Sequence, residues 1–286
     1  MASVSVVIVA QGAKPDQLVA AFGSLPESDC ELIVVGDPFA APELAAWKDQ
    51  AKVVTAGETP AGQRNAAVNA ATGDLVVVVN GHESLAPEAL TRHAEALAAD
   101  PNAVASYGRT AVHEEGHDVR LRPEKGRGGH VVSRLVKQKH LVASQACLVW
   151  RRGTLSEAPF RAESTTPAAL RLGLALDLAA KGEFVFVGEQ VAERISEPLD
   201  LVALEELVKV FLGILYSPDS LDDKLEQRAR FRLARHLVAM GKQYYRAEDY
   251  RLAGKFFDEA LKAAPSYFKG RRYQFLNFVK NTISRG

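Results

Sequence analysis

The sequence is poor in cysteine. Its 286 residues include two cysteines, Cys30 and Cys147, and each lies beside a hydrophobic run. Two cysteines so far apart provide neither a disulfide framework nor a C-x-x-C metal site. We therefore expect two buried free thiols and a protein of a reducing compartment.

An excess of charge of either sign is also absent. The 35 basic and 35 acidic side chains cancel to a net charge of +0. This balance argues against a protein that its overall charge holds to nucleic acid or to a membrane, and it leaves only local patches to consider. We expect no nucleic-acid partner.

Long apolar runs are missing as well. Residues 201–216 come nearest to a membrane span, but Glu205, Glu206 and Lys209 interrupt them. The segment MASVSVVIVAQG has no basic region and no cleavage site, so it predicts a first strand rather than a signal peptide. These features favour a cytoplasmic protein, and the length allows one large domain or two smaller ones.

Apolar strands alternate with helices along the first part of the chain. The patterns predict strands at 4–9, 31–35, 52–57, 75–79 and 103–109, and helices at 16–25, 42–49, 62–71 and 87–99. Such alternation is typical of a parallel sheet covered on both faces. Ligands bind at the carboxyl ends of strands in these sheets. The strand ends at Gln11, at Asp37 and at 80–83 are therefore the first places to look for a site.

Residues 112–131 combine Gly, His, Arg and Glu with little periodicity. They predict a mobile loop, either a lid over a site or a surface excursion. Strand character resumes at 141–150, a helix is expected at 168–180, and a further strand at 183–189. The scattered histidines of this region are interpreted as solvated loop residues rather than a zinc site: His113, His117, His130 and His140.

From about residue 199 the sequence predicts helices alone. We place a first domain at 1–198 and a helical extension at 199–286. A tetratricopeptide-like pattern begins at Ala234, and its large and small residues predict an antiparallel helix pair at about 234–267. They are Leu237, Met240, Gly241, Tyr244, Ala253, Phe257, Ala260 and Pro265. A lone pair does not form a concave peptide groove, so we expect it to pack on the main domain or on another subunit.

The last part of the chain is basic and aromatic. No acidic residue follows Glu259, whereas Lys269, Arg271, Arg272 and Lys280 alternate with aromatic residues. Two interpretations stay open. One is a solvated helix face over an aromatic core, and the other is a contact with anionic lipid or an acidic partner.

Five stretches together resemble the inverting family-2 glycosyltransferases of the GT-A fold. They are SVVIVAQG, ELIVVGD, GQRNAAVNAATGDLVVVVNGHESLAPEAL, ASQACLVWRRGTL and LALDLAAKGEFVFVGEQVAER. The resemblance implies a mixed α/β sheet flanked by helices, followed here by an all-α extension. It also implies a nucleotide-diphosphate-sugar donor, a divalent cation and a carboxylate base that activates an acceptor hydroxyl.

The sequence departs from the family at the metal site. The family has an Asp-x-Asp tip after the fourth strand, whereas this chain has Asn80, His82 and Glu83 in that region. An amide is a weak ligand for a hard cation, and imidazole suits Mn²⁺ better than Mg²⁺. Three interpretations follow: a weak manganese site on His82 and Glu83, a tip that caps the next helix, or metal-free contact between His82 and a phosphate.

The donor side of the resemblance is better kept. The resemblance implies that Asp37 contacts the nucleotide base, and the alternative is a turn or helix-capping residue. Gln11 replaces an aromatic residue that stacks on the base in the family. Arg64 and Asn65 match the family. The resemblance implies that Arg64 pairs with a donor phosphate or with Asp37.

The base and the late metal ligand are altered too. The family's base pair aligns with Leu170 and Arg171, and its late histidine aligns with Ser196. None of these deprotonates a hydroxyl at neutral pH. Glu163, in a loop, is the best substitute base, and Asp177 is expected to face solvent.

Two functions are compatible with these residues. The first is an atypical inverting hexosyltransferase that uses His82, Arg64 and Glu163. The second is an inactive pseudo-glycosyltransferase that binds a partner or a second copy through its helical tail. A Rossmann dehydrogenase is disfavoured, because GAKPDQ after the first strand is not G-x-G-x-x-G.

Overall fold

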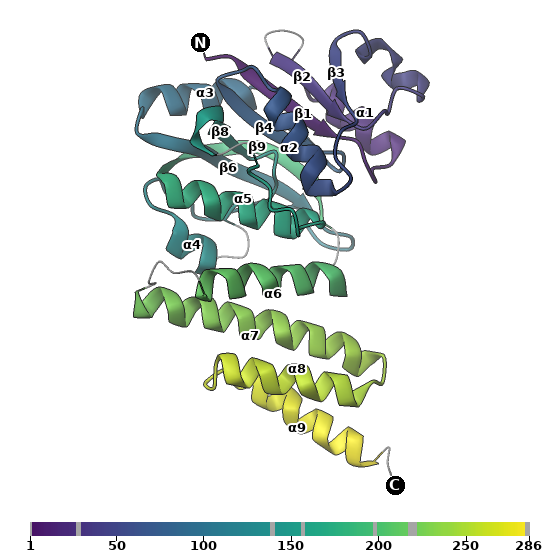
Figure 1. Cartoon of the computed structure of the whole chain (residues 1–286), viewed down its shortest axis with the longest axis vertical. Helices are drawn as coiled ribbons and strands as arrows, with labels where there is room; N and C mark the ends of the chain where they lie inside the picture. Colours follow the sequence, from purple (N-terminus) through teal and green to yellow (C-terminus); the bar gives the residue numbers. More distant parts are fainter. Residues whose placement is uncertain are drawn as a thin grey trace. The chain divides into compact units, whose positions relative to one another are not determined.

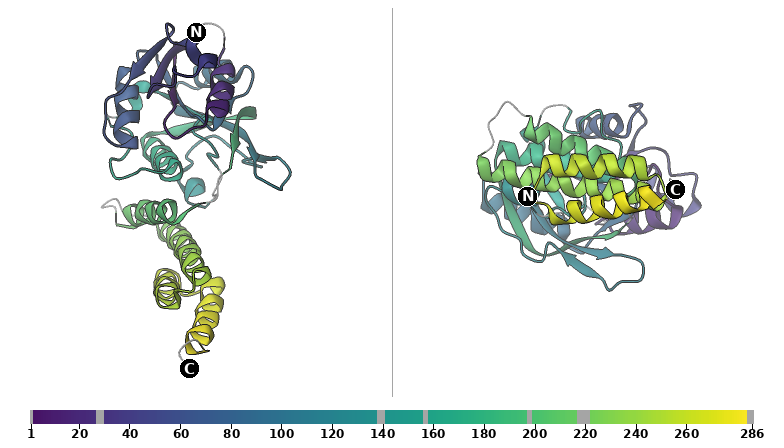
Figure 2. Two further views of the ribbon diagram at one scale, coloured as in Figure 1. Left: turned by 90° about the vertical axis from the view of Figure 1, so that its right-hand side faces the viewer. Right: turned by 90° about the horizontal axis from the view of Figure 1, so that it is seen from below.

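The computed structural model describes residues 2–26, 30–137, 141–155, 158–196, 199–216 and 222–283. The chain forms two compact units. One comprises Met1–Thr165 and Leu170–Glu197, and the other comprises Thr166–Ala169 and Pro198–Gly286. We call them the sheet unit and the helical unit. Figures 1 and 2 show their elements.

The sheet unit is built on one mixed sheet with the strand order β3-β2-β1-β4-β8-β6-β9-β5, and β7 pairs with β6. The strands are β1 Val4–Val9, β2 Cys30–Val35, β3 Ala51–Val54, β4 Leu75–Asn80, β5 Glu83–Leu85, β6 Ala103–His113, β7 Arg120–Arg122, β8 Leu148–Arg151 and β9 Glu183–Ile195. The prediction of an α/β sheet flanked by helices is confirmed.

The first four strands are parallel, and the rest make the sheet mixed. β1 lies between β2 and β4, and β2 pairs with β3, all in parallel. Every residue of β1 and β4 is buried, which explains their continuous valine-rich runs. β8 is antiparallel to β4 and to β6. The carboxyl ends of β1, β2 and β4 therefore lie at one edge of the sheet.

Helices connect the strands of this unit. They are α1 Pro15–Gly23, the 3₁₀ helix η1 Pro42–Trp47, α2 Pro60–Ala70, α3 Ala89–Ala99, α4 Val132–Lys137, the 3₁₀ helix η2 Arg152–Thr154 and α5 Pro167–Lys181. Thr59 caps α2, since its hydroxyl accepts a hydrogen bond from the Gly62 amide at 3.0 Å. α2 thus starts close behind the strand ends that form the candidate site.

Several predicted bounds were wrong. The segment 112–131 is not a continuous loop, because β6 extends to His113 and β7 pairs with it. The strand expected at 141–150 is confined to Leu148–Arg151. α3 begins at Ala89 rather than at 87, since Glu88 has a φ of 59° and breaks the helical path. The tip at 80–83 includes the first residue of a short strand, β5.

The helical unit contains α6 Leu201–Leu215, α7 Asp223–Arg246, α8 Tyr250–Ala263 and α9 Phe268–Ile283. α7 and α8 form a helix pair, and α9 packs against both (Figures 1 and 2). A Cβ atom on Gly241 would lie 2.5 Å from the Phe257 ring, so the two helices approach closely there. The helix pair starts earlier than expected, since α7 begins at Asp223. Whether it functions as a tetratricopeptide repeat remains a prediction.

Cys147 is buried, whereas Cys30 is partly exposed. The expectation of two buried thiols was therefore wrong for Cys30. In the described parts of the chain, no helix has the length and apolarity needed to span a membrane. His140 lies outside the described residues.

Candidate functional site

The tip of β4 is the centre of the candidate site. Asn80 is the last residue of β4, and Glu83 is the first of β5. Gly81 stands between them with its amide donating to the Val9 carbonyl at 3.0 Å. A side chain at Gly81 would collide with Ala13 and Leu18. Glycine is required here by close approach, and the tip is held against the end of β1.

Glu83 is a buried carboxylate whose oxygens are already hydrogen-bonded. It is 2% exposed. It accepts hydrogen bonds from the backbone N–H of Asn80 at 3.2 Å and from the side-chain Nδ2 of Asn80 at 3.0 Å. It also accepts from the backbone N–H groups of Gln145 at 3.0 Å and Ala146 at 3.3 Å. Four donors use most of the acceptor capacity of one carboxylate, so Glu83 anchors the tip to the segment before β8.

Arg64 completes this buried network. It is 4% exposed, and it donates to Asn80 Oδ1 at 2.7 Å and to the Pro60 carbonyl at 3.0 Å. Burial lowers the pKa of Arg64 to about 10, and the charge of Glu83 acts in the opposite direction. Arg64 has no hydrogen bond to Asp37 among the described residues. Its guanidinium is directed into the protein, toward Asn80 and Pro60.

The β4 tip does not fit a divalent cation. A metal ion needs several free oxygen or nitrogen ligands. The Glu83 oxygens face four N–H donors, and the Asn80 oxygen faces Arg64. His82 alone is left as a ligand at this tip. The described residues contain no group of three or more His, Cys, Asp or Glu side chains that could hold an ion.

A cavity of about 470 Å³ opens at the carboxyl ends of β1 and β2, and we call it the β1–β2 cavity. Gln11, Asp37 and Gln63 contribute its polar groups. Asp37 is exposed, and its Oδ1 accepts from the Phe39 amide at 3.2 Å, which leaves acceptor capacity for a ligand. Gln63 Oε1 is buried without a hydrogen-bond partner among the described residues. Gln11 and Asp37 therefore come together as the sequence predicts.

Asn65 is engaged elsewhere. Its Nδ2 donates to the Phe160 carbonyl, and its Oδ1 accepts from the Phe160 amide, both at 2.8 Å. This two-point contact fixes the loop before α5 to α2. Because both ends of the amide are used, Asn65 holds the fold of the site and does not face the β1–β2 cavity.

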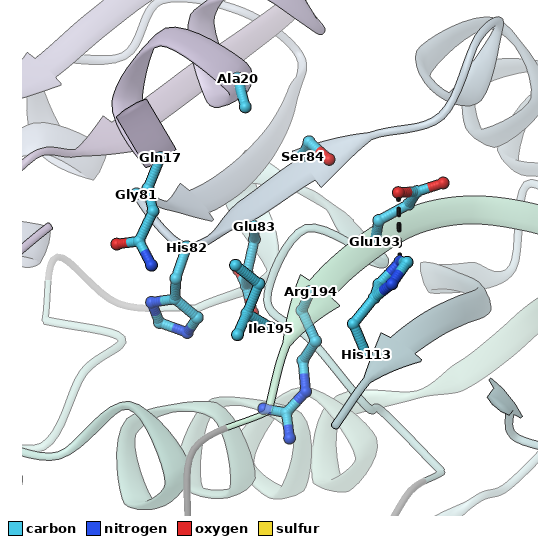
Figure 3. Close-up of a pocket in the computed structure, with 10 residues that line it drawn as sticks. All are labelled: Gln17, Ala20, Gly81, His82, Glu83, Ser84, His113, Glu193, Arg194 and Ile195. Carbon is cyan, nitrogen blue, oxygen red and sulfur yellow. Dashed lines mark ion pairs between the residues drawn. The ribbon is translucent and has the colours of Figure 1, made fainter. Parts of the chain in front are cut away.

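A second cavity, of about 270 Å³, lies beside the tip, and we call it the His82 cavity (Figure 3). His82, His113, Glu193 and Arg194 line it together with Gln17 of α1. His113 Nε2 lies 3.4 Å from a Glu193 oxygen. Figure 3 shows the Arg194 guanidinium directed away from that pair. Glu83 also lines it, so the cavity combines two imidazoles and a guanidinium with two carboxylates.

The predicted base region holds cations. Arg171, at the family's base position, lies near Arg194 and Glu83, and burial and then Arg194 lower its pKa to about 10. Asp177 was predicted to face solvent. Instead, both its carboxylate oxygens accept hydrogen bonds from Arg161, at 2.6 and 3.1 Å. Glu163 is exposed, and its charge acts on Arg161. No described contact brings Glu163 to either cavity.

The sequence did not single out Gln63, Gln145 or Arg194. Gln145 Oε1 accepts from Asn80 Nδ2 at 2.8 Å, although the two are far apart in the sequence. Arg194 lies in one of the five stretches that resemble the family, two residues before Ser196. Because Ser196 aligns with the family's late histidine, that alignment could have drawn attention to Arg194.

With this geometry in view, the comparisons identify the fold and the family. A family model described as glycosyl transferase family 2 matches residues 5–157. The chain therefore belongs to that family and is a glycosyltransferase-like protein with a GT-A α/β fold. No curated protein sequence matches the chain.

Solved structures of TarS from S. aureus share the fold. TarS 1-349 in complex with UDP-GlcNAc has a TM-score of 0.68 at 14% identity, over 99% of this chain and 92% of that one. TarS 1-349 in complex with UDP has a TM-score of 0.62 at 14% identity, with the same coverage. The longer TarS chain has a TM-score of 0.58 at 14% identity, over 96% of this chain and 54% of its own length. The likeness extends over the helical extension as well as the sheet.

Proposed function

We propose that this protein binds a nucleoside-diphosphate sugar, with the nucleoside in the β1–β2 cavity. The observation that carries the proposal is the cavity itself, which lies at the carboxyl ends of two parallel strands and presents Gln11, Asp37 and Gln63. A carboxylate such as Asp37 accepts a hydrogen bond from the imino N–H of a uracil ring. The TarS structures with UDP-GlcNAc and UDP make a uridine nucleotide the first ligand to test.

The proposed binding needs no Mn²⁺ or Mg²⁺. In the family the ion neutralises the diphosphate. Here the acidic residues of the tip are replaced or saturated by hydrogen bonds, and Arg64 already balances Glu83. His82, partly exposed at the edge of its cavity, remains available for direct contact with a phosphate. Of the three interpretations of the tip, we favour metal-free contact.

Transfer of the sugar is proposed to be very slow or absent. The position of the family's base holds Arg171, whose guanidinium does not accept a proton from a hydroxyl. Loss of a general base costs roughly 10²- to 10⁴-fold in rate. On this proposal the chain is a pseudo-glycosyltransferase that binds a nucleotide-sugar donor and acts through a partner protein.

Titration calorimetry tests the nucleotide site. UDP and GDP are titrated into the wild type, Gln11→Ala, Asp37→Ala and the control Asp16→Asn, which alters an exposed carboxylate on α1. We expect Asp37→Ala to weaken UDP binding by about tenfold, the value of one charge-assisted hydrogen bond. Asp16→Asn should match the wild type. Failure of both nucleotides to bind the wild type would overturn the proposal.

Donor hydrolysis tests the absence of turnover. UDP-GlcNAc is incubated with the wild type, and released UDP is followed against a protein-free blank. We expect the two rates to agree. Release that is faster with protein and slowed by Glu163→Gln would instead support the hexosyltransferase interpretation, with Glu163 as its base.

We further propose that α9 contacts a surface of anionic lipid. Phe268 and Phe275 are 74% and 66% exposed, and Arg271 and Arg272 are exposed on the same helix. The opposite face is occupied, since Asn277 is buried and donates to the Tyr250 carbonyl at 2.9 Å. Exposed aromatic rings with flanking cations are typical of a helix that lies in a lipid interface. Two copies of this basic face would repel each other, which disfavours a homodimer through it.

Vesicle sedimentation tests the lipid contact. The full chain is mixed with phosphatidylcholine vesicles, with or without phosphatidylserine. We expect sedimentation only with phosphatidylserine, and its loss in Phe268→Ala/Phe275→Ala and in Arg271→Gln/Arg272→Gln. Arg230→Gln on α7 is the control, since it alters an exposed cation elsewhere. The absence of sedimentation by the wild type would reject the lipid and leave an acidic protein as the partner to seek.

A further inference from the structure

The helical extension is basic although the whole chain is neutral. From residue 199 onward the sequence has 16 basic and 11 acidic side chains, against 35 of each in the full length. Residues three, four and seven positions apart lie on one face of a helix. Four basic residues of α7 have this spacing, and we call them the α7 basic row: Arg232, Arg235, Lys242 and Arg246 (Figure 1).

Arg232 is the buried member of the α7 basic row. It is 6% exposed, whereas Arg235 and Arg246 are exposed. Its Nε has no hydrogen-bond partner, and no carboxylate of the described residues forms an ion pair with its guanidinium. Burial and then the charge of Arg235 lower the pKa of Arg232 to about 10. A buried cation without a counter-charge is costly, and a carboxylate brought by a ligand would remove that cost.

The acidic side chains of the helical unit are used elsewhere. Three form ion pairs on their own helices: Glu205 with Lys209, Glu226 with Arg230, and Glu259 with Lys262. Three more accept from a backbone N–H at the start of a helix: Asp200, Asp222 and Asp249. Glu206 accepts from Thr166, and Asp258 accepts from Gln274. Among the described residues, Asp223 and Glu248 are exposed and form no ion pair with the row, which therefore keeps its positive charge.

Aromatic rings hold the α7 basic row in place. Lys242 Nζ lies 4.5 Å from the centroid of the Tyr273 ring of α9. That ring stacks on Phe257 of α8, with 5.7 Å between the centroids. A cation over an aromatic ring keeps its charge and loses conformational freedom before a ligand arrives. Lys242 is therefore preorganised for a further contact with an anion.

Carboxylates of a peptide fit this row better than other anions. The row is about 21 Å long at 1.5 Å per residue, which is the length of about six residues of an extended peptide. A guanidinium group binds a carboxylate through two parallel N–H donors. A lipid surface meets exposed side chains such as Phe268 and Phe275, whereas a single carboxylate side chain can contact a guanidinium that is 6% exposed. The net charge of +0 disfavours a nucleic acid.

We propose that the α7 basic row binds an acidic peptide segment of a partner protein. This inference rests on the proposed function, in which the chain acts through such a partner, and it names the chemistry of that partner. Arg232 and Arg235 pair with carboxylates of the segment, and Lys242 and Arg246 extend the contact along α7.

Fluorescence anisotropy of labelled octaglutamate, at low salt and with the full chain, tests the proposal. Octaglutamine is the neutral comparison. The proteins are the wild type, Arg232→Gln, Arg235→Gln/Arg246→Gln and the control Arg251→Gln, which alters an exposed cation of α8. We expect octaglutamate to bind and octaglutamine not to bind. Arg232→Gln and the double variant should each weaken octaglutamate binding by about tenfold or more, whereas Arg251→Gln should match the wild type.

The absence of octaglutamate binding by the wild type would overturn the proposal. Wild-type affinity in the double variant would overturn it too, and this variant decides even if Arg232→Gln is poorly folded, because both of its side chains are exposed. Labelled oligothymidylate that binds more tightly than octaglutamate and depends on the same residues would make a nucleic acid the ligand and reject the peptide. UDP is absent from these samples, so either result leaves the test of the nucleotide site separate.

Discussion

At the scale of single residues, Glu83 is the carboxylate on which the β4 tip depends. It accepts four hydrogen bonds while buried, and it faces Arg64 through Asn80. Glu83→Gln places an amide N–H against the backbone N–H donors of Asn80, Gln145 and Ala146. We expect the free energy of unfolding to fall by about 2 kcal/mol or more, measured by urea denaturation.

Glu58→Gln is the matched control for Glu83, because Glu58 is exposed and has no described hydrogen bond through its side chain. We expect it to change the free energy of unfolding by less than about 0.5 kcal/mol. An equally small effect of Glu83→Gln would mean that the carboxylate is solvated, and a metal site on it would again be open.

His93 gives a pH dependence that can be measured. It is fully buried, its Nδ1 lies 2.8 Å from Ser106 Oγ, and burial lowers its pKa to about 3 from 6.5. Below pH 6.5 the unfolded chain takes up a proton at this residue and the folded chain does not. The stability from His93 is therefore complete above pH 6.5 and is lost as the pH falls, by up to about 1.4 kcal/mol per pH unit.

Urea denaturation between neutral and mildly acidic pH tests this expectation. His93→Gln should flatten the dependence, because it removes the buried imidazole. A wild type and a His93→Gln variant with parallel pH profiles would show that His93 is protonated in the folded state.

The sequence did not predict in which direction the side chains of the site point. Arg64 and Asn65 were matched to the family by type and spacing, yet both are used inside the protein, by Asn80 and Phe160. Asp37 and Gln11 line one cavity, because the end of a parallel strand determines where its next residues lie. Their contact with a nucleotide stays a prediction.

At the scale of elements, the strands with continuous β-branched runs were predicted well. β1, β2 and β4 are buried on both faces, so their sequence pattern is strong. β7 was missed because its three residues are held by pairing with β6 rather than by their own propensity. The buried segment before β8 has an apolar pattern like that of a strand, but its backbone is fixed by Glu83.

The contact between α7 and α8 provides an element-scale prediction. A methyl group on Gly241 would lie 2.5 Å from Phe257, which is fully buried. We expect Gly241→Ala to destabilise the helical unit by about 1–3 kcal/mol through overpacking. Thermal unfolding followed by circular dichroism measures it.

A double-mutant cycle supplies the control for Gly241. In a Phe257→Leu background the ring is gone, so Gly241→Ala should cost much less than it does in the wild type. Equal costs in both backgrounds would place the strain elsewhere in α7.

At the scale of the whole molecule, the likeness to TarS covers 99% of this chain, so it includes the helical extension as well as the sheet unit. We propose a domain boundary near residue 198, which agrees in sequence with the division into two compact units. The family model matches residues 5–157 and does not reach α6 to α9. The role of the helical extension therefore has to be inferred from its own surface residues.

The domain proposal predicts where a protease cuts. Limited proteolysis of the full chain should release a fragment of the sheet unit that ends near residue 198 and still binds UDP. Cleavage that destroys UDP binding would show that the nucleotide site needs the helical extension.

The central claim is that a GT-A domain whose β4 tip does not fit a divalent cation still binds its nucleotide. The most direct test is calorimetric titration of UDP into the full chain, first in EDTA and then with excess Mn²⁺. We predict binding in EDTA, with an affinity that Mn²⁺ changes by no more than about twofold, or about 0.4 kcal/mol. Binding that appears only with Mn²⁺, or no binding under either condition, would contradict the account.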